Sequence, residues 1–227
     1  MRNVKIPPVT GKKTEAIIFD LGGVLLNLDF ESSIKEFIRL GFKDVRHELS
    51  VLLSAQPTPG NESLFHLYEK GLIGSDRFRD GLRELAGRHI GDQDIDRAWT
   101  SMLLDIHSEN VQVLESLKGS YRLFLLSNTN AIHIETLHGR EDNGSHYSRL
   151  VKVFEKVYYS HEVNMRKPDA EIFEHVIRDA GLTPEETLFI DDAETNVKAA
   201  RGCGLMAYHH KAGAGFDGIF TASRRSP

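Results

Sequence analysis

The chain has 227 residues, a formal net charge of −5 at pH 7 and 40% hydrophobic residues. These values suit a globular protein with a buried core, and the absence of a concentrated basic stretch excludes a typical nucleic-acid-binding surface. The single cysteine, Cys203, excludes an internal disulfide and any metal site that needs several cysteines. No apolar run approaches the roughly 20 residues of a membrane-spanning helix, and the N-terminus shows no signal-peptide pattern. We therefore expect a soluble cytoplasmic protein, monomeric or homodimeric, with neither a membrane nor a nucleic acid as partner.

Four short apolar runs predict the strands of a parallel sheet. They lack the alternation of half-exposed strands, which is typical of strands that helices cover on both faces. Each run ends in polar residues. The runs and their endings are 16–19 before Asp20, 123–126 before Ser127 and Asn128, 157–159 before Ser160, and 187–190 before Asp191 and Asp192. Because the carboxyl ends of parallel strands meet at one edge of a sheet, we expect these polar residues to surround one crevice.

Amphipathic helical segments separate the predicted strands. One is expected to have Ser108 as its cap and to end at Gly119. A second has Pro168 in its first turn, where proline is tolerated, and ends at Gly181. A third ends near Gly202. This alternation of strands and helices predicts an α/β fold, a doubly wound parallel sheet with a Rossmann-like core.

The chain between the first strand and residue 105 shows a different pattern. Apolar residues recur there at helical spacing, breakers separate the segments, and no comparable strand pattern interrupts them. The expected apolar faces include Ile38, Leu85 and Leu103. We therefore predict a helical cap domain inserted into the core. The expected boundaries are 1–14 for an N-terminal extension, 15–30 and 106–210 for the core, 31–105 for the cap, and 211–227 for a C-terminal tail.

The polar strand ends and one loop lysine supply the groups that hydrolysis of a phosphate ester needs. A carboxylate can attack phosphorus, and further carboxylates can hold Mg²⁺, which screens the negative charges from one another. A lysine offsets the remaining charge, and serine and asparagine supply hydrogen-bond donors for phosphate oxygens. In chain order these residues are Asp20, Ser127, Asn128, Lys167, Asp191 and Asp192. Singly, each is more often a turn, cap or surface residue, so the prediction depends on their combination.

Four segments resemble the motifs of the haloacid dehalogenase-like hydrolases. They are Asp20–Leu25, Leu126–Thr129, Arg166–Asp169 and Phe189–Asp192, in the order and strand context of that family. The helical insertion after the first segment matches the position of the family's mobile cap, and the resemblance extends from about residue 15 to residue 208. The pattern is most similar to the branch that holds α-D-glucose-1-phosphate phosphatase and the phosphatase domain of soluble epoxide hydrolases.

The resemblance implies a Mg²⁺-dependent phosphatase that hydrolyses a small phosphorylated metabolite, with a sugar phosphate as the expected substrate. The reaction would pass through an aspartyl-phosphate. The resemblance also implies a role for each motif residue. Asp20 is expected to be the nucleophile and a metal ligand, with the Gly22 carbonyl and Asp192 as further metal ligands. Asp191 is expected to support the metal or its waters. Ser127, Asn128 and Lys167 are expected to bind the phosphoryl group, and Lys167 is also expected to be catalytic.

Gly22 departs from the family pattern. Phosphatases of this family usually carry a second aspartate two residues after the nucleophile, where it protonates the leaving group, although the branch named above tolerates glycine at this position. Glycine keeps the carbonyl ligand but not the proton donor, and general acid catalysis contributes about 10²–10⁴ in rate. We therefore expect a leaving oxygen that needs little protonation, such as the anomeric oxygen of a sugar 1-phosphate, or another donor, or weak activity.

Other functions fit the same residues. A phosphomutase would form the same aspartyl-phosphate and return the phosphoryl group to a bound sugar. A haloacid dehalogenase needs no metal, which leaves the adjacent Asp191 and Asp192 unexplained. A receiver-type signalling module also uses an aspartyl-phosphate, but its acidic pair follows the first strand. A catalytically weak or non-catalytic relative is the remaining alternative, because Gly22 replaces the usual acid.

The histidines and the cap offer weaker patterns. None of the eleven histidines has the spacing of a known zinc site, and we expect them at the surface. Glu62, His66 and Tyr68 follow the loop at residues 57–60 and are candidates for contacts with a substrate. The sequence does not choose among them, because their orientation depends on how the helices pack.

Overall fold

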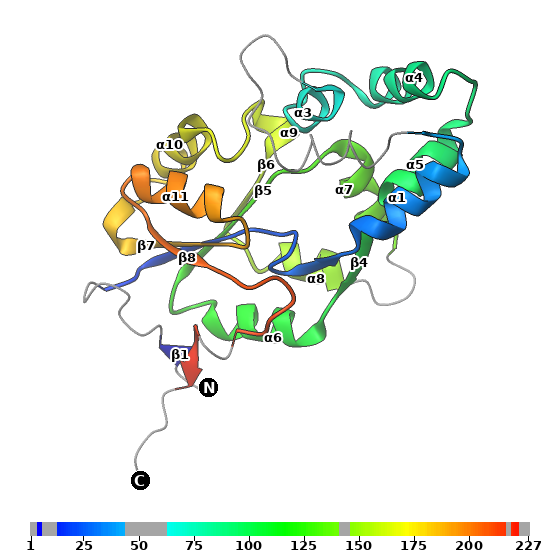
Figure 1. Ribbon diagram of the computed structural model, residues 1–227. Coiled ribbons are helices and arrows are strands. Elements are labelled where there is room, and N and C mark those ends of the chain that lie inside the picture. Colours follow the sequence, from blue (N-terminus) through cyan, green and yellow to red (C-terminus); the bar gives the residue numbers. More distant parts are fainter. Residues whose placement is uncertain (1–3, 6–12, 44–62, 141–145, 217–218, 223–227) are drawn as a thin grey trace.

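Parallel strands form the central sheet, in the spatial order β6-β5-β2-β7-β8 (Figure 1). They are β2 (Ala16–Phe19), β5 (Arg122–Ser127), β6 (Lys156–Tyr159), β7 (Thr187–Asp191) and β8 (Met206–His209). Phe19 pairs with Leu125 on one side and with Ile190 on the other, so the carboxyl ends of β2, β5 and β7 share one edge. The computed structural model describes residues 4–5, 13–43, 63–140, 146–216 and 219–222.

Helices cover both faces of the sheet, which explains why the central residues of its strands are apolar. They are α10 (Ala170–Asp179) and α11 (Glu194–Gly202) on one face, and α6 (Ser108–Leu117), α7 (Ala131–Gly139) and α8 (His146–Val151) on the other. Alternate residues of β2 serve the two layers. Ile18 packs in the cluster of α10 and α11, whereas Ile17 and Phe19 pack in the cluster of α6, α7 and α8. The doubly wound α/β fold predicted from the sequence is therefore confirmed.

A group of helices lies to one side of the sheet, next to α7 (Figure 1). They are α1 (Phe30–Arg39), α3 (Leu64–Glu69), α4 (Ser75–Ala86) and α5 (Asp92–Thr100). An aromatic cluster holds them together, because Phe37, Phe65 and Phe78 surround Trp99 with ring centroids 6.5, 5.4 and 5.3 Å away. The group occupies the predicted helical insertion, and its independence as a cap domain stays a prediction.

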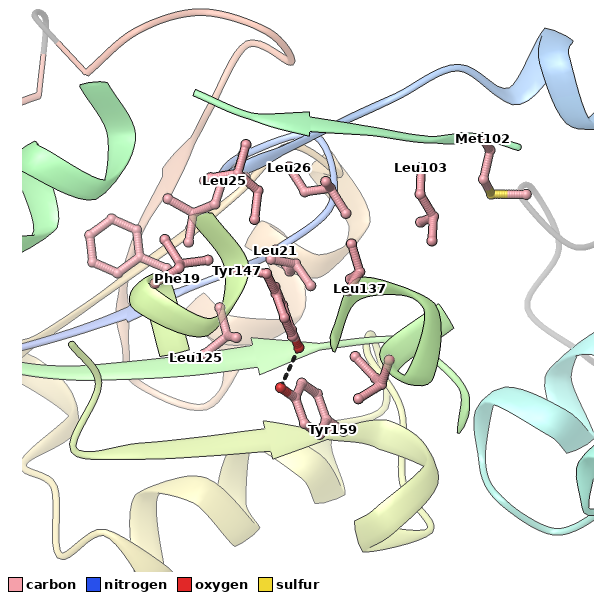
Figure 2. Close-up of a cluster of buried hydrophobic side chains, with 14 of the residues drawn as sticks. Phe19, Leu21, Leu25, Leu26, Met102, Leu103, Leu125, Leu137, Tyr147 and Tyr159 are labelled. Carbon is pink, nitrogen blue, oxygen red and sulfur yellow. Dashed lines mark hydrogen bonds between the residues drawn. The ribbon is translucent and has the colours of Figure 1, made fainter. Parts of the chain in front are cut away.

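A two-stranded antiparallel ribbon, which the sequence did not predict, separates these helices from the sheet. β3 (Leu26–Leu28) pairs in it with β4 (Leu103–Ile106). The expectation that Leu103 continues the apolar face of α5 was wrong, because α5 ends at Thr100. Figure 2 shows Leu103 pointing from the ribbon toward Leu137 of α7, within one apolar cluster. The two strands of the ribbon directly precede and follow the helical group in the chain, and side chains from both strands pack in the core.

The structure corrects several local predictions. α6 begins at Ser108 itself, and His107 occupies the capping position. Pro168 lies before the first turn of its helix rather than within it. Ile38 and Leu85 were expected on buried faces but are 50% and 51% exposed. Helical spacing alone did not locate the edge of the buried face at these two positions.

The C-terminal segment contributes to the core. Phe216 and Phe220 pack on Phe19 with ring centroids 5.9 and 6.1 Å away. β1 (Val4–Lys5) pairs antiparallel with β9 (Thr221–Ala222), so residues from the first and last described segments lie side by side (Figure 1). The core therefore extends beyond residue 210, the boundary expected from the sequence.

Two short helices complete the described fold. They are α9 (Ser160–Val163), which follows β6, and the 3₁₀ helix η2 (Pro184–Glu186), which precedes β7. Among the described residues, no helix combines the length and apolarity that crossing a bilayer requires.

Three histidines that were expected at the surface are buried: His66, His133 and His210. His133 connects α7 to α5, since its ring stacks on Trp99 at a centroid distance of 4.9 Å and its Nε2 lies 3.3 Å from the Trp99 carbonyl oxygen. Burial lowers the pKa of His133 to about 4, so the imidazole is neutral at pH 7 and packs as an aromatic ring.

We predict that His133 makes the fold less stable in mild acid. Between pH 6.5 and about 4 the unfolded chain binds a proton at this residue and the folded chain does not. The free energy of unfolding should therefore fall by about 1.4 kcal/mol for each pH unit of acidification in this window. His133→Gln, which keeps a donor toward the Trp99 carbonyl, should show a shallower dependence in urea titrations at several pH values. The exposed His89→Gln controls for loss of a histidine, and equal pH slopes in wild type and His133→Gln would contradict the prediction.

Candidate active site

Asp20, Lys167 and Asp191 meet at the carboxyl edge of the sheet. Lys167 Nζ lies 2.7 Å from Asp20 Oδ1 and 2.7 Å from Asp191 Oδ2. Asp20 follows β2, Asp191 ends β7, and Lys167 comes from the loop before α10. The side chains of Lys167 and Asp191 are 1% and 0% exposed, so water does not screen their ion pair. The structure thus brings together three of the residues that the sequence placed in one crevice.

Burial and charge act in opposite directions on this cluster. Burial raises the pKa of Asp20 to about 7, Lys167 opposes the rise, and Asp191 adds to it. Burial also raises the pKa of Asp192, again with Asp191 adding to the rise. Burial lowers the pKa of Lys167, but the carboxylates of Asp191 and Asp20 outweigh burial and the net shift is upward. The lysine is therefore charged, and the carboxylates around it outnumber it.

The carboxylates form a group that suits a divalent cation. Asp20, Asp191 and Asp192 each offer a ligand oxygen, and these oxygens lie within 4.8 Å of one another. When all three are ionised, two negative charges remain after Lys167 is counted. Hard cations such as Mg²⁺ prefer carboxylate and carbonyl oxygens, and a cation here would relieve the repulsion that raises the pKa of Asp20 and Asp192.

Gly23 lets Asp192 approach the loop that follows β2. Its φ is +74°, in the left-handed region that favours glycine, and a Cβ at this position would overlap the Asp192 carboxylate. The Gly23 N–H donates to the Leu26 carbonyl oxygen at 2.8 Å, which turns the chain directly into β3. The second glycine of the sequence after Asp20 is therefore required by the close packing of the carboxylate cluster.

Hydrogen bonds fix the two loops that carry Asn128 and Lys167. Asn128 Nδ2 donates to the Lys167 carbonyl oxygen at 2.8 Å, and the Lys167 N–H donates to Asn128 Oδ1 at 2.9 Å. Ser160 Oγ accepts from the Thr129 N–H at 2.9 Å and donates to the Thr129 carbonyl oxygen at 3.0 Å. The Asn128 side chain thus positions the backbone of Lys167 and is not free to contact a ligand through both of its polar atoms.

Asn196 is a site residue that the sequence analysis did not identify. Its Nδ2 lies 3.0 and 3.1 Å from the two oxygens of Asp191, and the Ala193 N–H donates to Asp191 Oδ1 at 2.8 Å. Asp191 is therefore held by α11 as well as by Lys167. The sequence offers one indication of this residue: Asn196 is a polar residue next to Val197, which was expected on the buried face of this helix, and the structure buries both.

A cavity of about 650 Å³ opens at the carboxylate cluster. A smaller one of about 120 Å³ adjoins it between the ribbon and the helical group. The residues that line both cavities are Gly22, Leu28, Phe30 and Asn128. Ser127 lines the smaller cavity, whose walls are otherwise mostly apolar. A phosphoryl group at the cluster would have space beside it for the group that carries it.

Leu28 takes the space beside Gly22. A Cβ on Gly22 would lie 2.8 Å from Leu28 Cδ1, so a larger side chain there requires Leu28 to move. The backbone of Gly22 is outside the left-handed region, and glycine is not needed for its conformation. An apolar side chain therefore lies beside the position where the acid is missing.

The cap residues singled out in the sequence have other surroundings. Glu62 lies outside the described residues. His66 and Tyr68 are buried, and the Tyr68 hydroxyl lies 2.8 Å from Ser75 Oγ and accepts from the Ile132 N–H at 3.2 Å. Tyr68 thus connects α3 to α4 and joins the helical group to α7.

A model of the haloacid dehalogenase-like hydrolase family matches residues 14–204. The chain belongs to this family. The match spans every motif segment from Asp20 to Asp192, which confirms the resemblance seen in the sequence. The reaction that this haloacid dehalogenase-like hydrolase performs depends on the groups assembled at its carboxylate cluster.

Several relatives of this haloacid dehalogenase-like hydrolase have assigned activities or solved structures. D-ribitol-5-phosphate phosphatase of Bacteroides thetaiotaomicron is 29% identical over 198 residues, which cover 87% of this chain and 92% of the relative. A sesquiterpene phosphatase of Aspergillus oryzae is 27% identical over 200 residues, which cover 86% of this chain and 89% of the relative. A family enzyme of Bacteroides thetaiotaomicron, solved with magnesium and inorganic phosphate, is 38% identical with a TM-score of 0.79 and covers 90% and 98%.

We predict that Gly23→Ala weakens cation binding at least tenfold, because the new methyl group displaces Asp192. Mg²⁺ titrations of the purified protein by calorimetry measure the effect. Gly181→Ala is the matched control, since Gly181 has a φ of +59° but no atom within 4 Å of its Cβ position. Both variants should lose similar thermal stability, and only Gly23→Ala should lose affinity for Mg²⁺. Equal affinities in the two variants would show that Asp192 does not hold the cation.

Proposed function

We propose that this haloacid dehalogenase-like hydrolase is a Mg²⁺-dependent phosphatase that hydrolyses a small phosphorylated metabolite through an aspartyl-phosphate. The observation that carries the proposal is the buried Asp20 carboxylate, paired with Lys167 beside Asp192 at a cavity. The phosphatase names of two relatives, and the magnesium and phosphate in the solved structure from Bacteroides thetaiotaomicron, support the same reaction.

In the proposed reaction, a carboxylate oxygen of Asp20 forms a bond to phosphorus while the bond to the leaving oxygen breaks. Lys167 orients the carboxylate and offsets the charge of the phosphoryl oxygens. Mg²⁺, held by Asp20, Asp192 and the Gly22 carbonyl, would neutralise the remaining negative charge. Water then hydrolyses the aspartyl-phosphate, which releases inorganic phosphate and restores Asp20.

The neighbouring residues have supporting roles in this proposal. The Ser127 hydroxyl and the backbone N–H of Asn128 donate to phosphoryl oxygens, because the Asn128 side chain is engaged with Lys167. Asp191 supports the site through its bonds to Lys167 and Asn196. Each role assigned from the family resemblance thus has a place in the proposed reaction, and Asn196 joins the set.

The leaving group is the part of the reaction with least help from the protein. Gly22 supplies no acid, and the apolar side chain of Leu28 lies beside it. A leaving oxygen that needs little protonation, such as the anomeric oxygen of a sugar 1-phosphate, departs most readily under these conditions. We therefore propose sugar or polyol phosphates as substrates, with sugar 1-phosphates hydrolysed faster than sugar 6-phosphates.

Asp20→Asn should lower the turnover of p-nitrophenyl phosphate by more than about a thousandfold, because the amide is a poor nucleophile. The size of the side chain is unchanged, so the melting temperature should stay close to that of the wild type. A chelator should abolish wild-type turnover, and added Mg²⁺ should restore it. Turnover of p-nitrophenyl phosphate that persists in the chelator would contradict the Mg²⁺ dependence of the proposed reaction.

Gly22→Asp combined with Leu28→Ala should raise turnover of an alkyl phosphate relative to p-nitrophenyl phosphate at least about tenfold, by supplying the missing acid. Gly22→Asp alone should give a smaller gain, since Leu28 then obstructs the new side chain. Leu28→Ala alone is the control for the enlarged cavity. An unchanged ratio of the two substrates in the double variant would show that proton donation does not limit the alkyl ester.

A further inference from the structure

Glu69 is the charged side chain in the smaller cavity beside the carboxylate cluster. Its neighbours are mostly apolar, and among the described residues that line this cavity no other carries a charge at pH 7, since His133 is neutral. Burying a carboxylate among apolar side chains costs free energy unless another group binds it, so we expect Glu69 to have a specific partner.

Arg166 supplies part of that partner. Its Nε and a terminal guanidinium nitrogen lie 3.1 and 3.0 Å from the same oxygen, Glu69 Oε2. The two side chains are 11% and 17% exposed, so the pair is largely shielded from water. Oε1 accepts no hydrogen bond within the described part of the chain. One carboxylate oxygen of Glu69 is therefore held, and the other has no hydrogen-bond partner among the described residues, in a side chain that lines the cavity.

The ion pair also places Glu69 relative to the reacting groups. Arg166 directly precedes Lys167, whose ammonium group holds Asp20. Lys70, the residue after Glu69, pairs with Asp169 at 3.3 Å, and Asn164 Nδ2 donates to the Lys70 carbonyl oxygen at 3.0 Å. The end of α3 is thus anchored to the loop that carries Lys167. Glu69 therefore has a defined position in the wall of the cavity that Gly22 and Ser127 also line.

Resting on the phosphatase function proposed above, we propose that Glu69 determines substrate specificity by accepting a hydrogen bond from a hydroxyl group of the leaving alcohol. The apolar walls hold the carbon chain, and Oε1 is the acceptor that a hydroxyl can reach. The same carboxylate repels a leaving group with a second acidic function. The substrate class that fits is a phosphate monoester of a neutral polyhydroxy compound, and neither a plain alkyl phosphate nor a phosphorylated acid.

The geometry distinguishes this role from that of the missing acid at Gly22. Burial raises the pKa of Glu69, while the guanidinium of Arg166 opposes the rise. The Glu69 carboxylate, paired with Arg166, can accept a hydrogen bond, and accepting one from a hydroxyl group requires no proton transfer. Glu69 is therefore a specificity-determining residue, and the leaving oxygen still departs without a dedicated acid.

Two matched substrate pairs test the proposal. Ribitol 5-phosphate and pentyl phosphate share a five-carbon chain but differ in hydroxyl groups, and glycerol 3-phosphate and 3-phosphoglycerate differ in one carboxylate. The wild type should prefer the first member of each pair in kcat/KM. Glu69→Gln should reduce each preference about ten- to a hundredfold, the effect of a hydrogen bond to a charged group. Turnover of p-nitrophenyl phosphate, which has no hydroxyl, should change little.

Glu84→Gln is the matched control, because it makes the same substitution in the helical group, at an exposed ion pair with Arg77 that does not line the cavity. It should leave both preferences unchanged. A uniform loss in Glu69→Gln on every substrate would assign Glu69 a structural role and overturn the proposal. Equal wild-type rates within each pair would overturn it without any variant. A wild type that hydrolyses none of these esters, p-nitrophenyl phosphate included, would instead contradict the phosphatase function.

Discussion

The buried ammonium group of Lys167 is the constraint on which the site depends. An unpaired charge in this position would be strongly destabilising, so the fold must bring carboxylates to it. Asp20 and Asp191 do so from two strands of the sheet, and each lies 2.7 Å from Lys167 Nζ. The cost of this arrangement is an excess of negative charge, since Asp192 lies in the same group. The excess makes the cluster suitable for a cation and for the phosphoryl oxygens that the cation attracts.

The loops around Lys167 have little freedom, because side chains bond to backbone atoms across them. Asn128 holds Lys167 through both its donor and its acceptor, and Ser160 does the same for Thr129. Such bonds place reacting groups before a substrate arrives, and a preorganised polar site is where electrostatic stabilisation is most effective. Asn196 extends the arrangement to α11 by holding Asp191.

The helical group between the two parts of the core contacts two of the loops that form the site. Trp99 Nε1 donates to Asn130 Oδ1 at 3.2 Å at the start of α7, so the aromatic cluster of the group reaches the loop after β5. Glu69 and Arg166 connect α3 to the loop before α10. The carboxylate cluster therefore belongs to the sheet, whereas Phe30, Glu69 and Trp99 of the helical group line the smaller cavity beside it.

The sequence by itself determined the α/β core and the residues Asp20, Lys167, Asp191 and Asp192, because strands buried on both faces leave a local pattern and their polar ends follow in the chain. Tertiary structure decided the β3–β4 ribbon, the burial of His133, and the exposure of positions on the helical faces. It also decided that Glu69 faces the cavity. These features depend on contacts between residues distant in the chain, and neither spacing nor composition records which surfaces will meet.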